Sequence, residues 1–91
     1  MDNKGPTRNV TVKSVIYSKH FNLGYDDYVK RKPYNKQYDN WSANDQMNYE
    51  RGRHYAVIFG NDKSFVPKIG NKVTEAAIYA AQIMVNNRFM I

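Results

Sequence analysis

Apolar and aromatic residues recur at helical spacing in three stretches of the chain. The first stretch covers about residues 15–31, and the following positions fall on one face of the predicted helix: Ile16, His20, Phe21, Gly24, Tyr25 and Tyr28. Pro33 ends this helix, because proline lacks the N–H that a helix needs and disfavours helical backbone in the residue before it. Ahead of the helix, Val10, Val12 and Val15 are compatible with a short extended segment.

The second stretch covers Ala43 to about Phe59. Ser42 is a suitable N-cap, and Asp45 in the first turn complements the positive end of the helix dipole. A competing interpretation is a strand over residues 55–59, because Ala-Val-Ile-Phe favours β-structure and a Gly-Asn-Asp turn signal follows. We favour the helix, and residues 33–42 then form a polar connection between the first two helices.

The third stretch is rich in alanine. Asn71 or Thr74 caps the predicted helix, and Asn86, Asn87 and Arg88 close it. Its helically spaced residues are Val73, Ala76, Ala77, Ala80, Ala81, Ile83 and Met84. The sequence therefore predicts a mainly α, small three-helix domain over residues 10–91, preceded by a flexible tail over residues 1–9. The first two helices are expected to form an antiparallel hairpin, with the alanine-rich C-terminal helix packed across it or onto a second copy.

Two glycines lie inside the first two predicted helices. Gly24 and Gly52 each cost about 1 kcal/mol of helix stability relative to alanine. Close approach of the two backbones would compensate for that cost, and a helix that ends or bends at the glycine is the alternative. We favour close packing of the two helices at these glycines.

Composition narrows the class of protein. The chain has 91 residues, 42% of them hydrophobic and 24% charged, which corresponds to one domain. It contains no cysteine, so disulfides, thiolate zinc sites and cysteine nucleophiles are excluded. No apolar run reaches the roughly 18 residues that span a bilayer, and the polar start of the chain does not resemble a secretory signal. We expect a cytoplasmic protein that does not bind membranes.

Candidate catalytic chemistry is sparse. His20 and His54 are the only histidines, and each lies on or beside an apolar helical face. The adjacent carboxylates Asp26 and Asp27 point in different directions on a helix, so they are poorly placed for paired acid–base catalysis. The sequence carries no metal-binding histidine spacing, phosphate-binding glycine loop or nucleophile turn. We expect a protein that is not an enzyme and holds no metal or cofactor.

Charge gives the first positive indication of a partner. The formal net charge is +6, which favours nucleic acid or an acidic protein surface. Lysine and arginine residues concentrate near the predicted end of the first helix, where tyrosines alternate with them and no acidic residue intervenes. Cations bind phosphate and flat rings stack on unpaired bases, so this mixture suits single-stranded or looped RNA. The alternative is a solvated helix end whose tyrosines cover the edge of the core.

Three residues outside this cluster complete the candidate surface. Trp41 is interpreted as a lid on the core or as an interface anchor. Arg51 and Arg53 flank Gly52, and we expect one of them to be held by the fold and the other to be available to phosphate or an acidic protein. The candidate binding residues are therefore Lys30, Arg31, Lys32, Tyr34, Lys36, Tyr38, Trp41, Arg51 and Arg53.

Part of the chain resembles a known family. The resemblance rests on Phe21, Gly24-Tyr25, Pro33-Tyr34 and the string YERGRHYA at residues 49–56. Over about residues 21–56 these elements resemble the ribosome modulation factor family, in the longer form carried by phages and prophages. Val66-Pro67 and the helix from Thr74 resemble the C-terminal extension of that form. The family has Cys-Pro-Tyr where this chain has Lys-Pro-Tyr, and Gly-Trp where this chain has a glycine between arginines.

The resemblance implies binding of ribosomal RNA during hibernation. Together with the charge, it predicts a non-catalytic basic regulatory protein, phage-encoded and active in the host cell cytoplasm, that binds RNA or a ribonucleoprotein such as the ribosome. An alternative is a phage protein that inhibits a host defence or transcription protein by direct binding. A third hypothesis is an assembly role as a homodimer through the C-terminal helix, with a self-association seam of Ala76, Ala77, Ala80 and Ala81.

Overall fold

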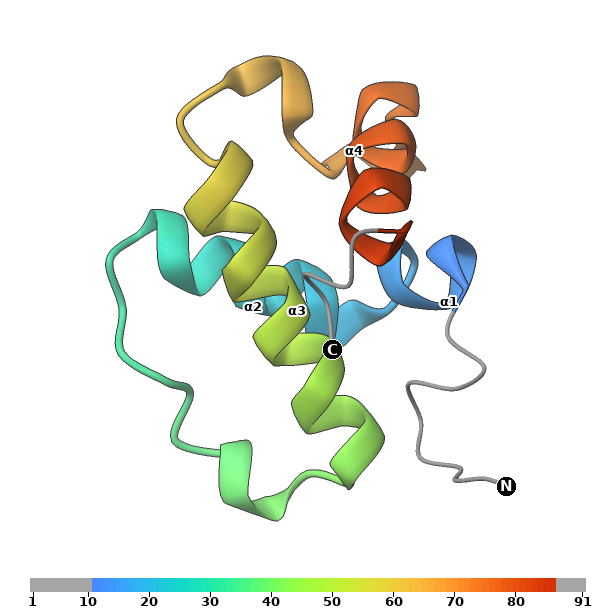
Figure 1. Ribbon diagram of the computed structural model, residues 1–91. Coiled ribbons are helices and arrows are strands. Elements are labelled where there is room, and N and C mark those ends of the chain that lie inside the picture. Colours follow the sequence, from blue (N-terminus) through green and yellow to red (C-terminus); the bar gives the residue numbers. More distant parts are fainter. Residues whose placement is uncertain (1–10, 87–91) are drawn as a thin grey trace.

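Four α-helices account for most of residues 11–86, the part of the chain that the computed structural model describes (Figure 1). Their bounds are α1 Val12–Ile16, α2 Lys19–Val29, α3 Ala43–Phe59 and α4 Glu75–Asn86. Two short 3₁₀ helices, η2 Tyr38–Asn40 and η3 Lys63–Phe65, lie in the connections. The prediction of a mainly α fold is confirmed. The predicted tail over residues 1–9 and the closing residues Asn87 and Arg88 lie outside the described residues.

Ser18 divides the first predicted helix into two. Its backbone is extended, and its hydroxyl oxygen accepts hydrogen bonds from the backbone N–H groups of His20 (3.1 Å) and Phe21 (3.3 Å). It therefore caps α2, while α1 is a separate single turn that buries Val15 and Ile16. A continuous helix over residues 15–31, a total of three helices and an extended segment at Val12 and Val15 are thus wrong, and Val10 lies outside the described residues. The helical spacing of apolar residues continues across this break, so the spacing alone does not reveal it.

The two later helices begin at the predicted caps. The Ser42 hydroxyl accepts a hydrogen bond from the Asp45 N–H (3.2 Å), and α3 continues to Phe59, which excludes the alternative strand. The Thr74 hydroxyl accepts from the Ala77 N–H (3.2 Å) and donates to the Val66 carbonyl (2.8 Å), so it caps α4 and ties it to the preceding loop.

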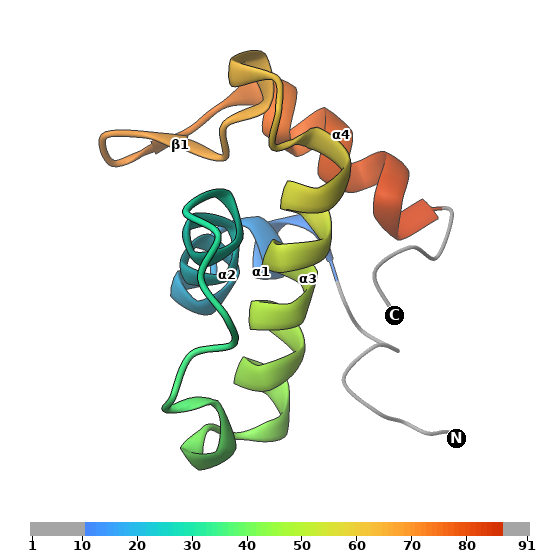
Figure 2. The ribbon, with the colours of Figure 1, turned by 90° about the vertical axis from the view of Figure 1, so that its left-hand side faces the viewer.

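A small β-hairpin precedes α4. β1 (Lys68–Ile69) pairs antiparallel with β2 (Lys72–Val73), and Figure 2 shows the hairpin projecting away from the helices. Gly70 in its turn has φ +64°, a left-handed conformation that favours glycine. The sequence did not predict this element, because two-residue strands carry no detectable alternation.

The α2–α3 contact is a backbone-to-backbone packing at two glycines. A Cβ atom placed on Gly24 would overlap the carbonyl oxygen of Tyr49, and one on Gly52 would overlap that of Phe21. Both overlaps are with backbone atoms, which cannot move aside by changing a rotamer. The predicted close packing of the two helices is confirmed.

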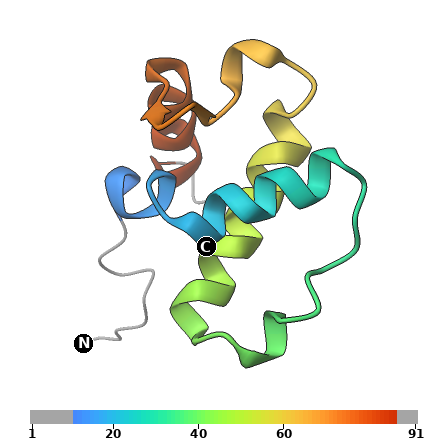
Figure 3. The same ribbon diagram turned by 180° about the vertical axis from the view of Figure 1, so that it is seen from behind.

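The two helices nevertheless do not form an antiparallel hairpin. His20 in the first turn of α2 lies 3.5 Å from Asp45 in the first turn of α3, and Tyr28 near the end of α2 lies beside Arg53 in the second half of α3. The helices thus run in the same general direction as they cross (Figures 1 and 3). Residues 30–42 run back alongside α3 to its start (Figure 2), so this connection serves as a return path rather than a tight turn.

The core lies between the crossed helices and α4. The rings of Phe21 and Tyr25 meet the ring of Tyr55 edge-on, with centroid distances of 5.4 and 5.9 Å. α4 packs chiefly against α1 and buries one face completely, namely Ala77, Ala80, Ala81 and Met84. Three of the four alanines of the predicted self-association seam therefore pack inside one chain and are not available at the surface. A homodimer through the C-terminal helix stays a prediction and would have to use other residues.

Candidate nucleic-acid interface

The predicted cations lie on an exposed loop that directly follows α2. We call residues 30–36 the basic loop, and all four of its charged side chains are exposed: Lys30, Arg31, Lys32 and Lys36. No acidic residue interrupts the loop. The four positive charges thus lie along an exposed segment that leads from the end of α2 back alongside α3.

The loop begins with a tightly hydrogen-bonded turn that ends α2. The Arg31 N–H donates to the Tyr28 carbonyl (2.9 Å), and the Lys32 N–H donates to the Asp27 carbonyl (2.8 Å). This is the Schellman pattern, in which the residue in the Arg31 position is left-handed and is usually glycine. Arg31 has φ +62°, a conformation that costs a residue with a Cβ about 1–2 kcal/mol. The cations here also stabilise the negative end of the helix dipole.

Arg53 holds the middle of the basic loop against α3. Its guanidinium donates to the carbonyl oxygens of Lys32 (3.1 Å) and Pro33 (3.4 Å). The same group lies 4.8 Å from the centroid of the Tyr34 ring, within the range of a cation–π interaction. Arg53 is half-buried. Of the two arginines that flank Gly52, it is the one that structurally supports the candidate surface.

The Tyr49 hydroxyl joins α2, the loop and α3. It donates to the Asp27 carboxylate (2.6 Å) and accepts from the Asn35 backbone N–H (2.9 Å) and from Arg53 (3.3 Å). Burial, and then the bond to Asp27, raise the pKa of Tyr49. The sequence interpretation missed this role for Asp27, which is only 4% exposed. The available signal was its position three residues after Gly24, on the face of α2 that packs against α3.

The three predicted aromatic contacts differ in exposure. Tyr34 is 50% exposed, whereas Tyr38 and Trp41 are half-buried. The Tyr38 hydroxyl donates to the Glu50 carboxylate, and this bond is the main reason that the pKa of Tyr38 is raised to about 12. Trp41 packs edge-on against His20 and Tyr49, at centroid distances of 4.6 and 5.0 Å. Tyr34 therefore offers the most accessible ring, above a supporting layer of aromatic side chains.

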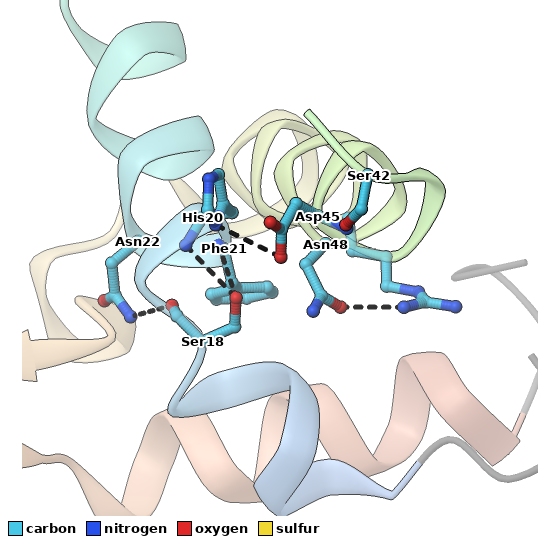
Figure 4. A network of polar contacts seen from close by, with 8 residues as sticks. Ser18, His20, Phe21, Asn22, Ser42, Asp45 and Asn48 are labelled. Carbon is cyan, nitrogen blue, oxygen red and sulfur yellow. Dashed lines mark hydrogen bonds and ion pairs between the residues drawn. The ribbon is translucent and has the colours of Figure 1, made fainter. Parts of the chain in front are cut away.

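Arg51 lies away from the exposed surface. It is 3% exposed, and its guanidinium donates to the Asn48 side-chain oxygen (2.7 Å). Burial lowers the pKa of this guanidinium. Asn48 lies close to the polar contacts of Ser18, His20 and Asp45, where α1, α2 and α3 meet (Figure 4). Surface phosphate binding by Arg51, one of the sequence predictions, is therefore wrong, because the side chain is used inside the fold.

The exposed candidate surface consists of Lys30, Arg31, Lys32, Tyr34 and Lys36, supported from beneath by Tyr38, Trp41 and Arg53. Within residues 11–86, no three His, Cys, Asp or Glu side chains converge as a metal site would require. None of the helices in this range combines the length and apolar character needed to cross a membrane.

Comparisons with known proteins add no relative. A scan against protein-family models, a search of curated proteins and a search of solved structures each found no match. The resemblance to the ribosome modulation factor family thus stays a prediction, and the function has to be argued from the surface itself.

Proposed function

We propose that this chain is a non-catalytic basic regulatory protein that binds RNA or a ribonucleoprotein through its basic loop. The observation that carries the proposal is a set of four exposed cations with a half-exposed tyrosine, on a loop whose backbone is hydrogen-bonded to α2 and α3. Cations at this spacing bind successive phosphates, and the tyrosine ring is available to stack on an unpaired base.

The rigidity of the loop supports this proposal. Arg53 binds two of its carbonyl groups, and the Tyr49 hydroxyl binds the Asn35 N–H. A flexible loop would lose backbone conformational entropy on binding, at about 1–2 kcal/mol for each residue that becomes ordered. Because the backbone is already held, more of the electrostatic attraction remains available for affinity.

The conformation of Arg31 is a second supporting observation. A glycine at this position would avoid the cost of a left-handed backbone, yet the chain carries an arginine there. Strained backbone that persists at an exposed, charged site is characteristic of functional residues. We infer that the guanidinium of Arg31 contacts phosphate.

Salt-dependent binding of a short single-stranded RNA tests the proposal. The loop variant replaces Lys30, Lys32 and Lys36 with glutamine. The matched control replaces Lys13, Lys63 and Lys72, which are also exposed but lie elsewhere. Each triple substitution lowers the formal net charge from +6 to +3.

We expect the loop variant to bind more weakly and to reduce the slope of log affinity against log salt by about 2, since each phosphate contact to a single strand contributes about 0.7. The control should keep a slope close to that of the wild type. Equal losses in the two triple variants would show that only overall charge matters. A wild type that does not bind RNA would overturn the proposal.

Salt also separates this proposal from direct inhibition of a host protein. RNA-mediated capture from host lysate should disappear with nuclease or with moderate salt, because phosphate contacts weaken steeply as salt rises. A protein contact centred on aromatic and apolar side chains should survive both treatments. A single host protein that stays bound under both conditions would favour the inhibitor hypothesis.

A further inference from the structure

A groove opens beside the basic loop, between the C-terminal ends of α2 and α3. Its volume is about 340 Å³, and its lining includes Tyr28, Val29, Arg31, Val57 and Asn61. Small-ligand sites usually occupy about 300–1,000 Å³, so the groove is large enough for a compact ligand but not for a folded element. Arg31 belongs both to this groove and to the candidate phosphate surface.

The lining combines three kinds of chemistry. Val29 and Val57 line the groove and are 37% and 56% exposed, but most of the lining surface is polar. The Tyr28 ring is half-buried and lies 5.7 Å from the guanidinium of Arg53, which also fixes the basic loop. Asn61 is exposed and carries an amide, which both donates and accepts hydrogen bonds.

We propose that this groove receives the base of one unpaired nucleotide while Arg31 binds the adjoining phosphate. A base carries hydrogen-bond donors and acceptors along its edge, which suit a mostly polar groove whose lining includes the Asn61 amide, and its flat face can stack on the Tyr28 ring. Guanidinium groups bind phosphate through paired hydrogen bonds. This inference rests on the proposed RNA binding and adds to it a specific site for a base.

Charge complementarity favours a nucleic acid strand as the occupant. Lys30 and Lys32 flank Arg31 in the sequence, and both are exposed. Phosphates that precede and follow the bound nucleotide would meet these cations, whereas a single acidic side chain would need only one of them. The groove is thus placed where a phosphodiester chain along the basic loop could turn one base inward.

The test compares an RNA oligomer with a ribose-phosphate oligomer of equal length that carries no bases. The affinity for RNA divided by the affinity for the base-free oligomer reports base contacts, since the phosphate contribution is common to both ligands. Val57→Trp fills the groove with an indole ring. Ile58→Trp is the matched control, because Ile58 is the next residue of α3, is 44% exposed and does not line the groove. Circular dichroism verifies that both variants fold.

We expect Val57→Trp to lower this ratio at least fivefold, as loss of one stacked base contact predicts, without changing the salt slope. Ile58→Trp should keep the ratio of the wild type. Asn61→Ala, a smaller change in an exposed turn, should lower the ratio about threefold through loss of one hydrogen bond. It provides a second readout if the tryptophan variant does not fold.

The outcomes separate this inference from the proposed function. RNA binding that depends on the basic loop, with a ratio that neither groove variant changes, would overturn the base site and leave the proposed function standing. Absence of RNA binding by the wild type would overturn both. If oligoglutamate binds as tightly as RNA and Val57→Trp weakens that binding, the groove accepts an acidic protein segment and the base assignment is wrong.

Discussion

Arg31 provides the sharpest test of the link between fold and function, because two substitutions that remove the same charge should both impair binding yet differ in stability. Arg31→Gly removes the cost of a left-handed backbone at φ +62° and keeps both turn-closing hydrogen bonds, which are made by backbone atoms. Arg31→Ala removes the same charge but retains a Cβ and therefore the strain. The pair of variants separates the backbone contribution from the loss of charge.

The expected magnitude follows from two opposing effects. Relief of the left-handed strain is worth about 1–2 kcal/mol, and the greater freedom of glycine in the unfolded chain offsets about 0.5–1 kcal/mol of it. Loss of the charge near the end of α2 costs both variants about 0.3–1 kcal/mol. Arg31→Gly should thus be about 1 kcal/mol more stable than Arg31→Ala, which corresponds to roughly 4–8 °C in Tm for a domain of this size.

Thermal unfolding followed by circular dichroism measures this difference, and a urea titration checks it at constant temperature. Both variants should bind single-stranded RNA more weakly than the wild type. A glycine variant no more stable than the alanine variant would refute the argument about backbone strain. RNA affinity unchanged in both variants would remove Arg31 from the site.

Three further predictions follow from the same contacts. Gly52→Ala should destabilise the fold by about 1–3 kcal/mol in urea denaturation, although alanine is the better helix former, because its Cβ would overlap the Phe21 carbonyl; a more stable variant would contradict the close packing. Arg53→Lys keeps the charge but loses the paired donors, so hydrogen exchange at the Asn35 N–H should accelerate about tenfold for each bond lost; unchanged exchange would show that the loop is held by other contacts. The Tyr38 hydroxyl stabilises the fold in its protonated form, so the stability difference between wild type and Tyr38→Phe should be fully present below pH 10 and should disappear as pH rises through about 12; a difference independent of pH would contradict the assigned bond.

Local signals in the sequence determined the helical character of the protein and several of its boundaries. Ser42 and Thr74 cap α3 and α4 as expected, and α3 has the predicted bounds of residues 43–59. A cap satisfies N–H groups within three residues of itself, so the information lies within a short window of sequence. Gly24 and Gly52 predicted the close packing of α2 and α3 for a similar reason. A glycine lowers helix stability, and close approach of two backbones compensates for that loss.

The sequence also identified the cations of the basic loop, but not how they are held. The run of Lys30, Arg31 and Lys32 is visible directly, and exposure is the default for such residues. Asp27, Asn35 and Tyr49 are far apart in the chain, and only the fold brings them to one hydroxyl group. The groove at Val57 likewise exists only because the ends of α2 and α3 lie side by side.

The relative direction of α2 and α3 was decided by tertiary structure alone. A helical face has the same periodicity in either direction, so the facing glycines are compatible with parallel and antiparallel crossings alike. What selects the observed crossing is the path of residues 30–42, fixed by the bonds from Arg53 to Lys32 and Pro33 and from Tyr49 to Asn35. Burial of Arg51 is likewise a property of the fold, because its guanidinium bonds Asn48 where α1, α2 and α3 meet. Hydrophobic spacing shows which side of a helix faces inward, whereas contacts between distant residues decide which neighbour that side meets.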